Sequence, residues 1–142
     1  MEKLKDTVGI FLINKDNKVL LHLRDNHPSL FMSGMWTGLG GSIEENETAE
    51  EAVFRELNEE ISFKPKELCY LMRYNHKDRI VDIFFSYVDF QYPSFLPLKE
   101  GVALKFYTIE EIHNLYKEGK TNLDIINQIN ILKSEVLRDL KK

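Results

Sequence analysis

Three glutamates in the middle of the chain have the type and spacing needed to bind a metal ion. Glu56, Glu59 and Glu60 follow the glycine pair Gly40-Gly41 in a segment that has the pattern of a helix. Positions three and four apart share a helix face, so Glu59 and Glu60 should both lie beside Glu56. Crowded carboxylates oppose one another's ionisation unless a cation neutralises them. Hard oxygen ligands suit Mg²⁺ or Mn²⁺ and leave room for phosphates, so the spacing predicts a metal site that acts on phosphates.

The same glutamates also have a simpler explanation. The chain has 23 acidic residues among 142, and glutamate-rich helices are usually solvated faces with ion pairs between residues four apart. Glu51 with Arg55, or Arg55 with Glu59, has this spacing. The number of acidic residues taken alone favours this second explanation, and only a longer pattern can decide against it.

Such a pattern surrounds the glutamates, and it resembles the signature of the Nudix hydrolases. That signature runs glycine, five residues, Glu, seven residues, Arg-Glu, an aliphatic residue, any residue, Glu-Glu, any residue, glycine and an apolar residue. The positions that match in this chain are Gly41, Glu47, Arg55, Glu56, Leu57, Glu59, Glu60 and Phe63. Matches at fixed spacing over a segment of this length are much more specific than a lone glycine motif.

One position departs from the signature, because Ser62 stands where the family has glycine. Glycine is favoured just past a helix end because it takes the left-handed conformation without steric cost. We expect Ser62 either to accept that conformation at a cost of about 1 kcal/mol or to form another turn. This departure concerns the end of the helix and not the carboxylates.

Local patterns define the helix that carries the glutamates, over about 48–61. Thr48 and Glu51 have the spacing of a capping box at its start. Val53, Leu57 and Ile61 recur every four residues and should face the core. The three glutamates fall on a different arc of the helix, where we expect them to line a cleft.

The resemblance implies a role for each matching residue. Glu56 and Glu60 would be the principal metal ligands, with Glu59 as a third ligand or as the base that activates water. The carbonyl of Gly40 would complete the metal shell, because glycine lets the backbone approach closely. Arg55 would orient a neighbouring carboxylate by charge-assisted hydrogen bonds.

Residues outside the glutamate helix are further candidates. Glu100 precedes the last expected strand, similar in position to an extra glutamate of the family that serves as ligand or base, but a surface loop acid explains it equally well. Arg24 could bind a phosphate or be a surface arginine. Trp36 and Phe31 could stack on a base, although aromatic residues beside a core more often serve packing.

Composition limits the class of protein. A chain of 142 residues fits one domain, 1–142, and 43% hydrophobic with 30% charged residues is ordinary for a globular protein. A net charge of −4 offers no broad basic field to an extended nucleic acid. The single Cys69 excludes an internal disulfide and a cysteine-rich zinc site. No segment resembles a membrane span or a secretory signal, so we expect a cytoplasmic location without membrane partners.

The remaining pattern predicts strands and helices in a mixed order. Strands are expected at 7–14, 18–24, 36–41, 68–74, 79–90 and 102–107, with 68–74 and 79–90 paired antiparallel around a turn at 75–78. Further helices should run from 108 to about 116 and onward from 122 or 124. This mixture indicates an α/β or α+β sandwich. The resemblance implies the Nudix fold, an α/β/α sandwich with a mixed sheet between helices, over the whole chain.

The resemblance also implies an activity: metal-dependent hydrolysis of a pyrophosphate bond in a nucleoside diphosphate linked to another group. We expect nucleoside triphosphates, oxidised ones included, to give a monophosphate and pyrophosphate. Sugar nucleotides and ADP-ribose-type substrates are the alternatives. A module that binds nucleotides and has lost catalysis would tend to lose the three glutamates, which are present here. Family members are often dimers, which leaves a homodimer open.

Overall fold

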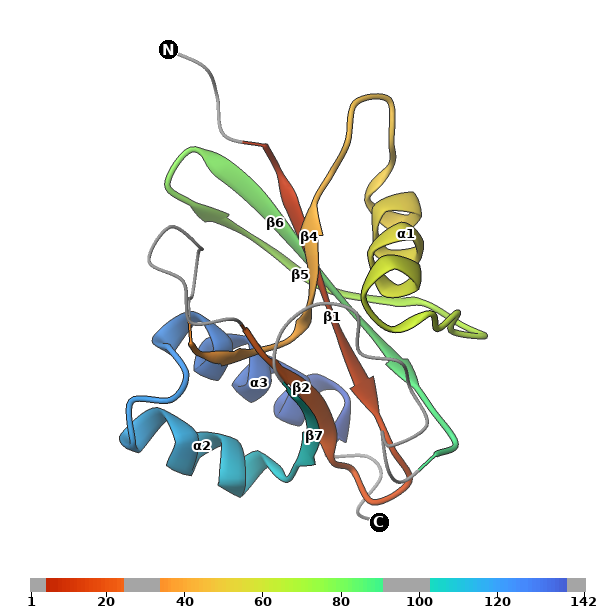
Figure 1. Ribbon diagram of the computed structural model, residues 1–142. Helices are drawn as coiled ribbons and strands as arrows, with labels where there is room; N and C mark the ends of the chain where they lie inside the picture. The colour runs from red at the N-terminus through yellow and green to blue at the C-terminus, as the bar shows by residue number, and fades with distance from the viewer. Residues whose placement is uncertain (1–4, 25–33, 91–102, 138–142) are drawn as a thin grey trace.

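The protein has a single mixed β-sheet with helices against both of its faces (Figure 1). The structure, a computed structural model, describes residues 5–24, 34–90 and 103–137. The expectations for Phe31 and Glu100 therefore lie outside the described residues. The predicted α/β/α sandwich of mixed α+β type is confirmed.

Seven strands form the described sheet. In chain order they are β1 (Thr7–Ile13), β2 (Val19–Leu23), β3 (Trp36–Thr37), β4 (Leu39–Ser42), β5 (Cys69–His76), β6 (Arg79–Tyr87) and β7 (Ala103–Tyr107). Neighbouring strands lie in the order β3-β2-β1-β6-β5, with β4 paired to β1 and β7 to β2. The β1–β6 pair is parallel and the other pairs are antiparallel, which makes the sheet mixed.

The sheet separates two hydrophobic cores, because successive residues of a strand point to opposite faces. On β1, Ile10 and Leu12 belong to the core beneath helix α1 (Ala49–Ile61). Phe11 and Ile13 belong to the core on the other face, beneath helices α2 (Ile109–Lys117) and α3 (Leu123–Glu135). The sheet thus packs against α1 on one face and against α3 on the other.

The helices begin where their caps predict. Thr48 and Thr108 each form both hydrogen bonds of a capping box, with Glu51 and Glu111. The side chain of Asn122 accepts a hydrogen bond from the backbone N–H of Ile125 at the start of α3. Local hydrogen bonding at each N-terminus therefore fixes where each helix starts.

The β5–β6 hairpin is tighter than its predicted turn at 75–78. β5 continues to His76 and β6 begins at Arg79, so that only Lys77 and Asp78 connect them. Lys77 takes a positive φ of 57°, as a two-residue hairpin turn requires.

No helix in the described parts of the chain is long and apolar enough to cross a membrane.

Ser62 takes the left-handed conformation that glycine would take, with φ 51° and ψ 42°. Its backbone N–H donates to the carbonyl of Asn58, which ends α1 in the ordinary way. The helix therefore has the expected geometry, and the serine carries the steric cost of a Cβ in this region.

We predict that Ser62→Gly raises the free energy of unfolding by about 1 kcal/mol, because glycine removes that steric cost. Urea denaturation of the two proteins measures the difference. Ser62→Ala keeps the Cβ and serves as the control, which should show no gain. A Ser62→Gly variant less stable than the wild type would contradict this account of the helix end.

Candidate active site

The candidate site begins at β4, where the backbone lies very close to β1. Gly40 pairs with Gly9 and has a φ of +150°. A Cβ on Gly40 would lie 2.1 Å from the carbonyl oxygen of Val8. Only glycine fits this position, so the glycine pair of the sequence motif is a requirement of the strand pairing.

Two glutamates of α1 lie over this glycine pair. A Cβ on Gly41 would lie 2.4 Å from Oε1 of Glu56, so the Glu56 carboxylate rests directly against the Gly41 backbone. One turn further along α1, Oε2 of Glu60 accepts a hydrogen bond of 3.3 Å from the backbone N–H of Gly40. Glu60 is only 3% exposed. The absence of side chains at Gly40 and Gly41 is what lets both carboxylates approach the strand.

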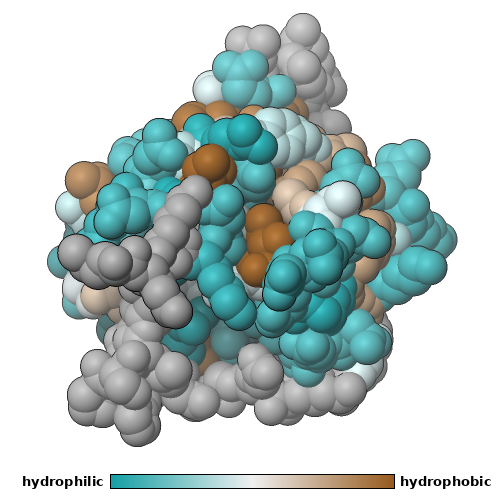
Figure 2. Space-filling view, turned by 90° about the horizontal axis from the view of Figure 1, so that it is seen from above, coloured by the Kyte–Doolittle hydropathy of each residue, from teal (hydrophilic) through white to brown (hydrophobic). Residues whose placement is uncertain are grey.

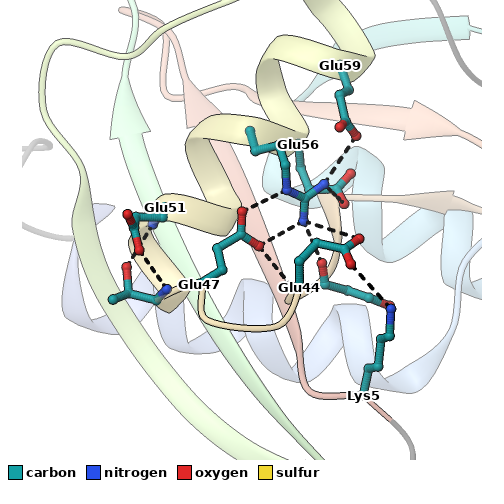
Figure 3. A network of polar contacts seen from close by, with 9 residues as sticks. Lys5, Glu44, Glu47, Glu51, Glu56 and Glu59 are labelled. Atoms are coloured by element: carbon teal, nitrogen blue, oxygen red, sulfur yellow. Dashed lines mark hydrogen bonds and ion pairs between the residues drawn. The ribbon is translucent and has the colours of Figure 1, made fainter.

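Arg55 donates hydrogen bonds to Glu47, Glu56 and Glu59, which are labelled in the polar network of Figure 3. Its Nε and Nη2 donate to the two carboxylate oxygens of Glu47, at 2.7 and 3.0 Å. Nη2 also donates to the carbonyl oxygen of Ser42 at 2.8 Å, and Nη1 donates to Glu56 Oε1 at 3.0 Å and Glu59 Oε2 at 3.2 Å. One guanidinium thus joins the end of β4, the loop before α1 and two glutamates of α1.

This network shifts the ionisation of its members. Hydrogen bonds to Glu47 and then to Glu56, with their charges, raise the pKa of Arg55, while partial burial acts the other way. The Arg55 hydrogen bond, together with the backbone N–H of Glu44, lowers the pKa of Glu47. Both groups are therefore charged over the whole neutral range, and Glu47 forms a permanent link between loop and helix.

The three glutamates do not converge on one point. The Glu59 side chain is 49% exposed and pairs with Arg55. This is one of the ion pairs between residues four apart that the simpler explanation anticipated. Glu51 is taken up by the capping box with Thr48. Within the described ranges, no group of three or more His, Cys, Asp or Glu side chains is arranged so that it could hold a metal ion. Glu56 contacts Gly41 and Glu60 contacts Gly40, whereas Glu59 is hydrogen-bonded to Arg55.

A cleft of about 180 Å³ opens beside the glycine pair, on the α3 face of the sheet. The end of the molecule that Figure 2 shows is mostly hydrophilic, with hydrophobic side chains visible in a hollow near its centre. Arg24 lines the cleft, and its buried Nε has no hydrogen-bond partner among the residues that the structure places. Trp36 is not one of the lining residues, and its ring packs edge-to-face against Tyr107 with 5.1 Å between centroids.

The far wall of the cleft contains residues that sequence patterns did not single out. Tyr74, His76, Arg79 and Gln128 all line it. They come from β5, β6 and α3, and only the folded chain brings them to the same cleft as Gly40. The polar residue Gln128 in an otherwise apolar helix stripe was the one signal that could have indicated this wall.

Comparison with known proteins shows the family of the chain. The family model for the NUDIX domain matches residues 3–128, so the chain belongs to the Nudix hydrolase family. The 8-oxo-dGTP diphosphatase of Escherichia coli is 34% identical over 93 residues, covering 63% of this chain and 68% of that protein. The ADP-ribose pyrophosphatase of Methanocaldococcus jannaschii is 44% identical over 68 residues, covering 48% of this chain and only 38% of that protein.

Solved structures show the same fold. The MutT protein of Methanosarcina mazei Go1 superposes with a TM-score of 0.73 at 23% identity, covering 100% of this chain and 99% of that one. The NUDIX domain of Shewanella oneidensis NrtR, solved with ADP ribose, gives 0.74 at 21% identity, covering 96% and 90%. At these identities the likeness establishes the fold alone.

The link between Glu47 and Arg55 predicts a pH dependence of stability. A carboxylate whose folded pKa is lowered stabilises the fold above its unfolded pKa, about 4.3, and that contribution is lost as the pH falls through the folded value. Glu47→Gln removes the contribution, so the variant should be less stable than the wild type near neutral pH. The two curves of unfolding free energy should then approach each other below the ordinary glutamate range.

Urea titrations from neutral to acidic pH measure both curves. Glu45→Gln, at an exposed position of the same loop, is the matched control and should run parallel to the wild type. A Glu47→Gln curve parallel to the wild type over the whole range would contradict the stabilising role of this pair.

Proposed function

We propose that this Nudix protein is a metal-dependent hydrolase of a nucleotide pyrophosphate bond, acting as a single domain over 1–142. The observation that carries the proposal is the position of the Glu56 and Glu60 carboxylates over the glycine pair of β4, with Arg55 holding Glu56. Two carboxylates brought against backbone in this way form an oxygen-rich site beside a cleft. Such a site suits a hard cation and a phosphate chain.

The chemistry of the oxygen donors over the glycine pair suits a Mg²⁺ or Mn²⁺ ion. Glu56, Glu60 and the carbonyl of Gly40 would hold it, and Glu59 would be either a third ligand or the base. The donor set is entirely of oxygen atoms, and the open surface beside Glu59 leaves room for substrate phosphates. A bound ion would stabilise charge on phosphoryl oxygens and lower the pKa of bound water.

The chain's own residues would position the reacting groups. Arg55 fixes the rotamer of Glu56 and holds the Glu59 carboxylate by a second hydrogen bond. The half-exposed Glu59 can accept a proton from water at the rim of the site. Arg24 presents a planar cation to the cleft, where a phosphate oxygen would give its Nε a partner.

Nucleoside triphosphates, oxidised ones included, are the substrates that we favour, with a monophosphate and pyrophosphate as products. The support is the E. coli 8-oxo-dGTP diphosphatase, because the similarity extends over about two thirds of its length. Relatives named ADP-ribose pyrophosphatase and RNA pyrophosphohydrolase are each matched over 38% of their length. Sugar nucleotides and ADP-ribose-type substrates are therefore the second choice.

The other expected roles are proposals of unequal support. For Trp36, the contact with Tyr107 supports packing in place of base stacking. Phe31 in stacking and Glu100 as extra ligand or base follow from the sequence alone.

We further propose a cytoplasmic protein that acts on small nucleotides, with no membrane or extended nucleic-acid partner, and a homodimer as the assembly to test.

A hydrolysis screen tests the activity. Nucleoside triphosphates, 8-oxo-dGTP, sugar nucleotides, ADP-ribose and dinucleoside polyphosphates are incubated with Mg²⁺ or Mn²⁺, and the released nucleotides are separated and counted. We predict that Glu56→Gln and Glu60→Gln each lower kcat at least about a hundredfold, which corresponds to about 2.7 kcal/mol of transition-state stabilisation.

Glu50→Gln, on the exposed first turn of the same helix, is the matched control and should keep full activity. Thermal melting shows that each variant is folded. A loss under threefold in both Glu56→Gln and Glu60→Gln would refute the assigned site. A wild type that binds nucleotides and hydrolyses none would favour a regulatory binding module instead.

A further inference from the structure

A buried amide lies in the wall of the cleft. Gln128 on α3 is only 4% exposed and lines the cavity, and its Nε2 donates a 2.9 Å hydrogen bond to the hydroxyl of Tyr74 on β5. Burying an amide is unfavourable unless its hydrogen bonds are replaced. The Tyr74 bond uses one amide proton, and the second proton and the carbonyl oxygen are available to a ligand in the cleft.

The floor of the cleft is low and apolar. Ile83 lies over Gly9, where a Cβ would be 3.0 Å from its Cδ1, and Phe11 lies over Gly38, where a Cβ would be 2.9 Å from its Cε1. Because both glycines lack a side chain, Ile83 and Phe11 pack directly on the backbone. The space above them can receive a flat ring, with Ile125 of α3 among the residues of the wall.

The charges of the cleft indicate which charge the part of the ligand outside the ring should have. Arg24 and Arg79 bring positive charge to the lining, His76 lines it as well, and no carboxylate is found among the described residues that line it. Asp124, which is not one of the lining residues, lies 3.2 Å from His76 Nδ1. A cationic ligand has no partner here, whereas a neutral ring attached to an anionic phosphate chain does.

The cleft and the glutamate pair have Gly40 and Gly41 in common. Both glycines line the cleft and contact the glutamates, Gly41 at Glu56 and Gly40 at Glu60, and Tyr74 and Gln128 line the same cavity. A cavity of about 180 Å³ is smaller than the roughly 300–1,000 Å³ of drug-sized sites. It therefore suits one base and not both halves of a dinucleotide.

We propose that Gln128 is the specificity-determining residue of this cleft and reads a nucleobase edge that carries an adjacent hydrogen-bond donor and acceptor. Tyr74 is a positioning residue that fixes the rotamer of the Gln128 amide. This inference rests on the proposed function for the identity of the substrate, and it adds the part of the protein that selects among bases. A site built around an amide discriminates because a base with the wrong edge leaves the buried group unpaired.

The test measures base selectivity in the full-length protein. KM and kcat are determined with Mg²⁺ for ATP, GTP, CTP, UTP and 8-oxo-dGTP. In Gln128→Leu we expect KM for the preferred base to rise by roughly tenfold to a hundredfold, while kcat changes less than about threefold. The spread of kcat/KM among bases should collapse. Asn127→Leu, an exposed amide one position away on α3, should keep the wild-type pattern.

Tyr74→Phe is a second variant that tests the pair if Gln128→Leu fails to fold. It should raise KM for the preferred base and leave kcat unchanged, and the double variant should lose no more than Gln128→Leu alone. Base selectivity that survives in both variants would overturn the inference, as would a wild type that shows no selectivity among bases.

Failure of the proposed function gives a different result. If the wild type hydrolyses nothing, calorimetric titration with the same five nucleotides replaces the kinetics. Base-selective binding that Gln128→Leu abolishes would support the inference and contradict the hydrolase. Binding without base preference, or no nucleotide binding, would overturn the inference as well.

Discussion

The arrangement of the site depends on one side chain, the guanidinium of Arg55. It contacts the end of β4 through the Ser42 carbonyl, the loop through Glu47, and α1 through Glu56 and Glu59. Several carboxylates so close together would repel one another, and a cation at their centre converts this repulsion into a set of short hydrogen bonds. Arginine suits the role because its planar fork satisfies several oxygens at fixed angles, which a lysine does not.

Glycine is the second requirement, because the carboxylates must approach a strand. Gly40 of β4 can lie this close to β1 only because it has no Cβ. Gly41 leaves free the space that the Glu56 carboxylate occupies. Helix and strand therefore meet where one element has side chains and the other has none. Glycine has a similar role on the other face of the sheet. There Gly9 and Gly38 lack side chains, so that Ile83 and Phe11 pack on the backbone and form the floor of the cleft.

Elements specified by local chemistry could be predicted from the sequence. The capping residues Thr48 and Thr108 fixed the starts of two helices because their hydrogen bonds lie within one turn. The match to the Nudix signature indicated the family and the fold, which the NUDIX model confirms. The left-handed Ser62 was one of two stated outcomes, since local sterics allow both.

Features that depend on distant contacts could not be predicted. The Arg55–Glu59 pair has a local spacing that the sequence offered, whereas the burial of Glu60 against Gly40 depends on a contact 20 residues apart in sequence. The Tyr74–Gln128 pair joins β5 to α3 through a contact 54 residues apart in sequence. Its formation requires the whole sheet, which no local pattern encodes.

Binding of Mn²⁺ to the full-length protein, followed by the electron paramagnetic resonance signal of the free ion, tests the central claim most directly. The claim is that the Glu56 and Glu60 carboxylates over the glycine pair form the cation site. Wild type and Glu50→Gln should bind Mn²⁺ equally, and Glu56→Gln or Glu60→Gln should weaken binding at least about tenfold, because each removes a charged oxygen ligand. Equal Mn²⁺ affinity in all four proteins would contradict the account.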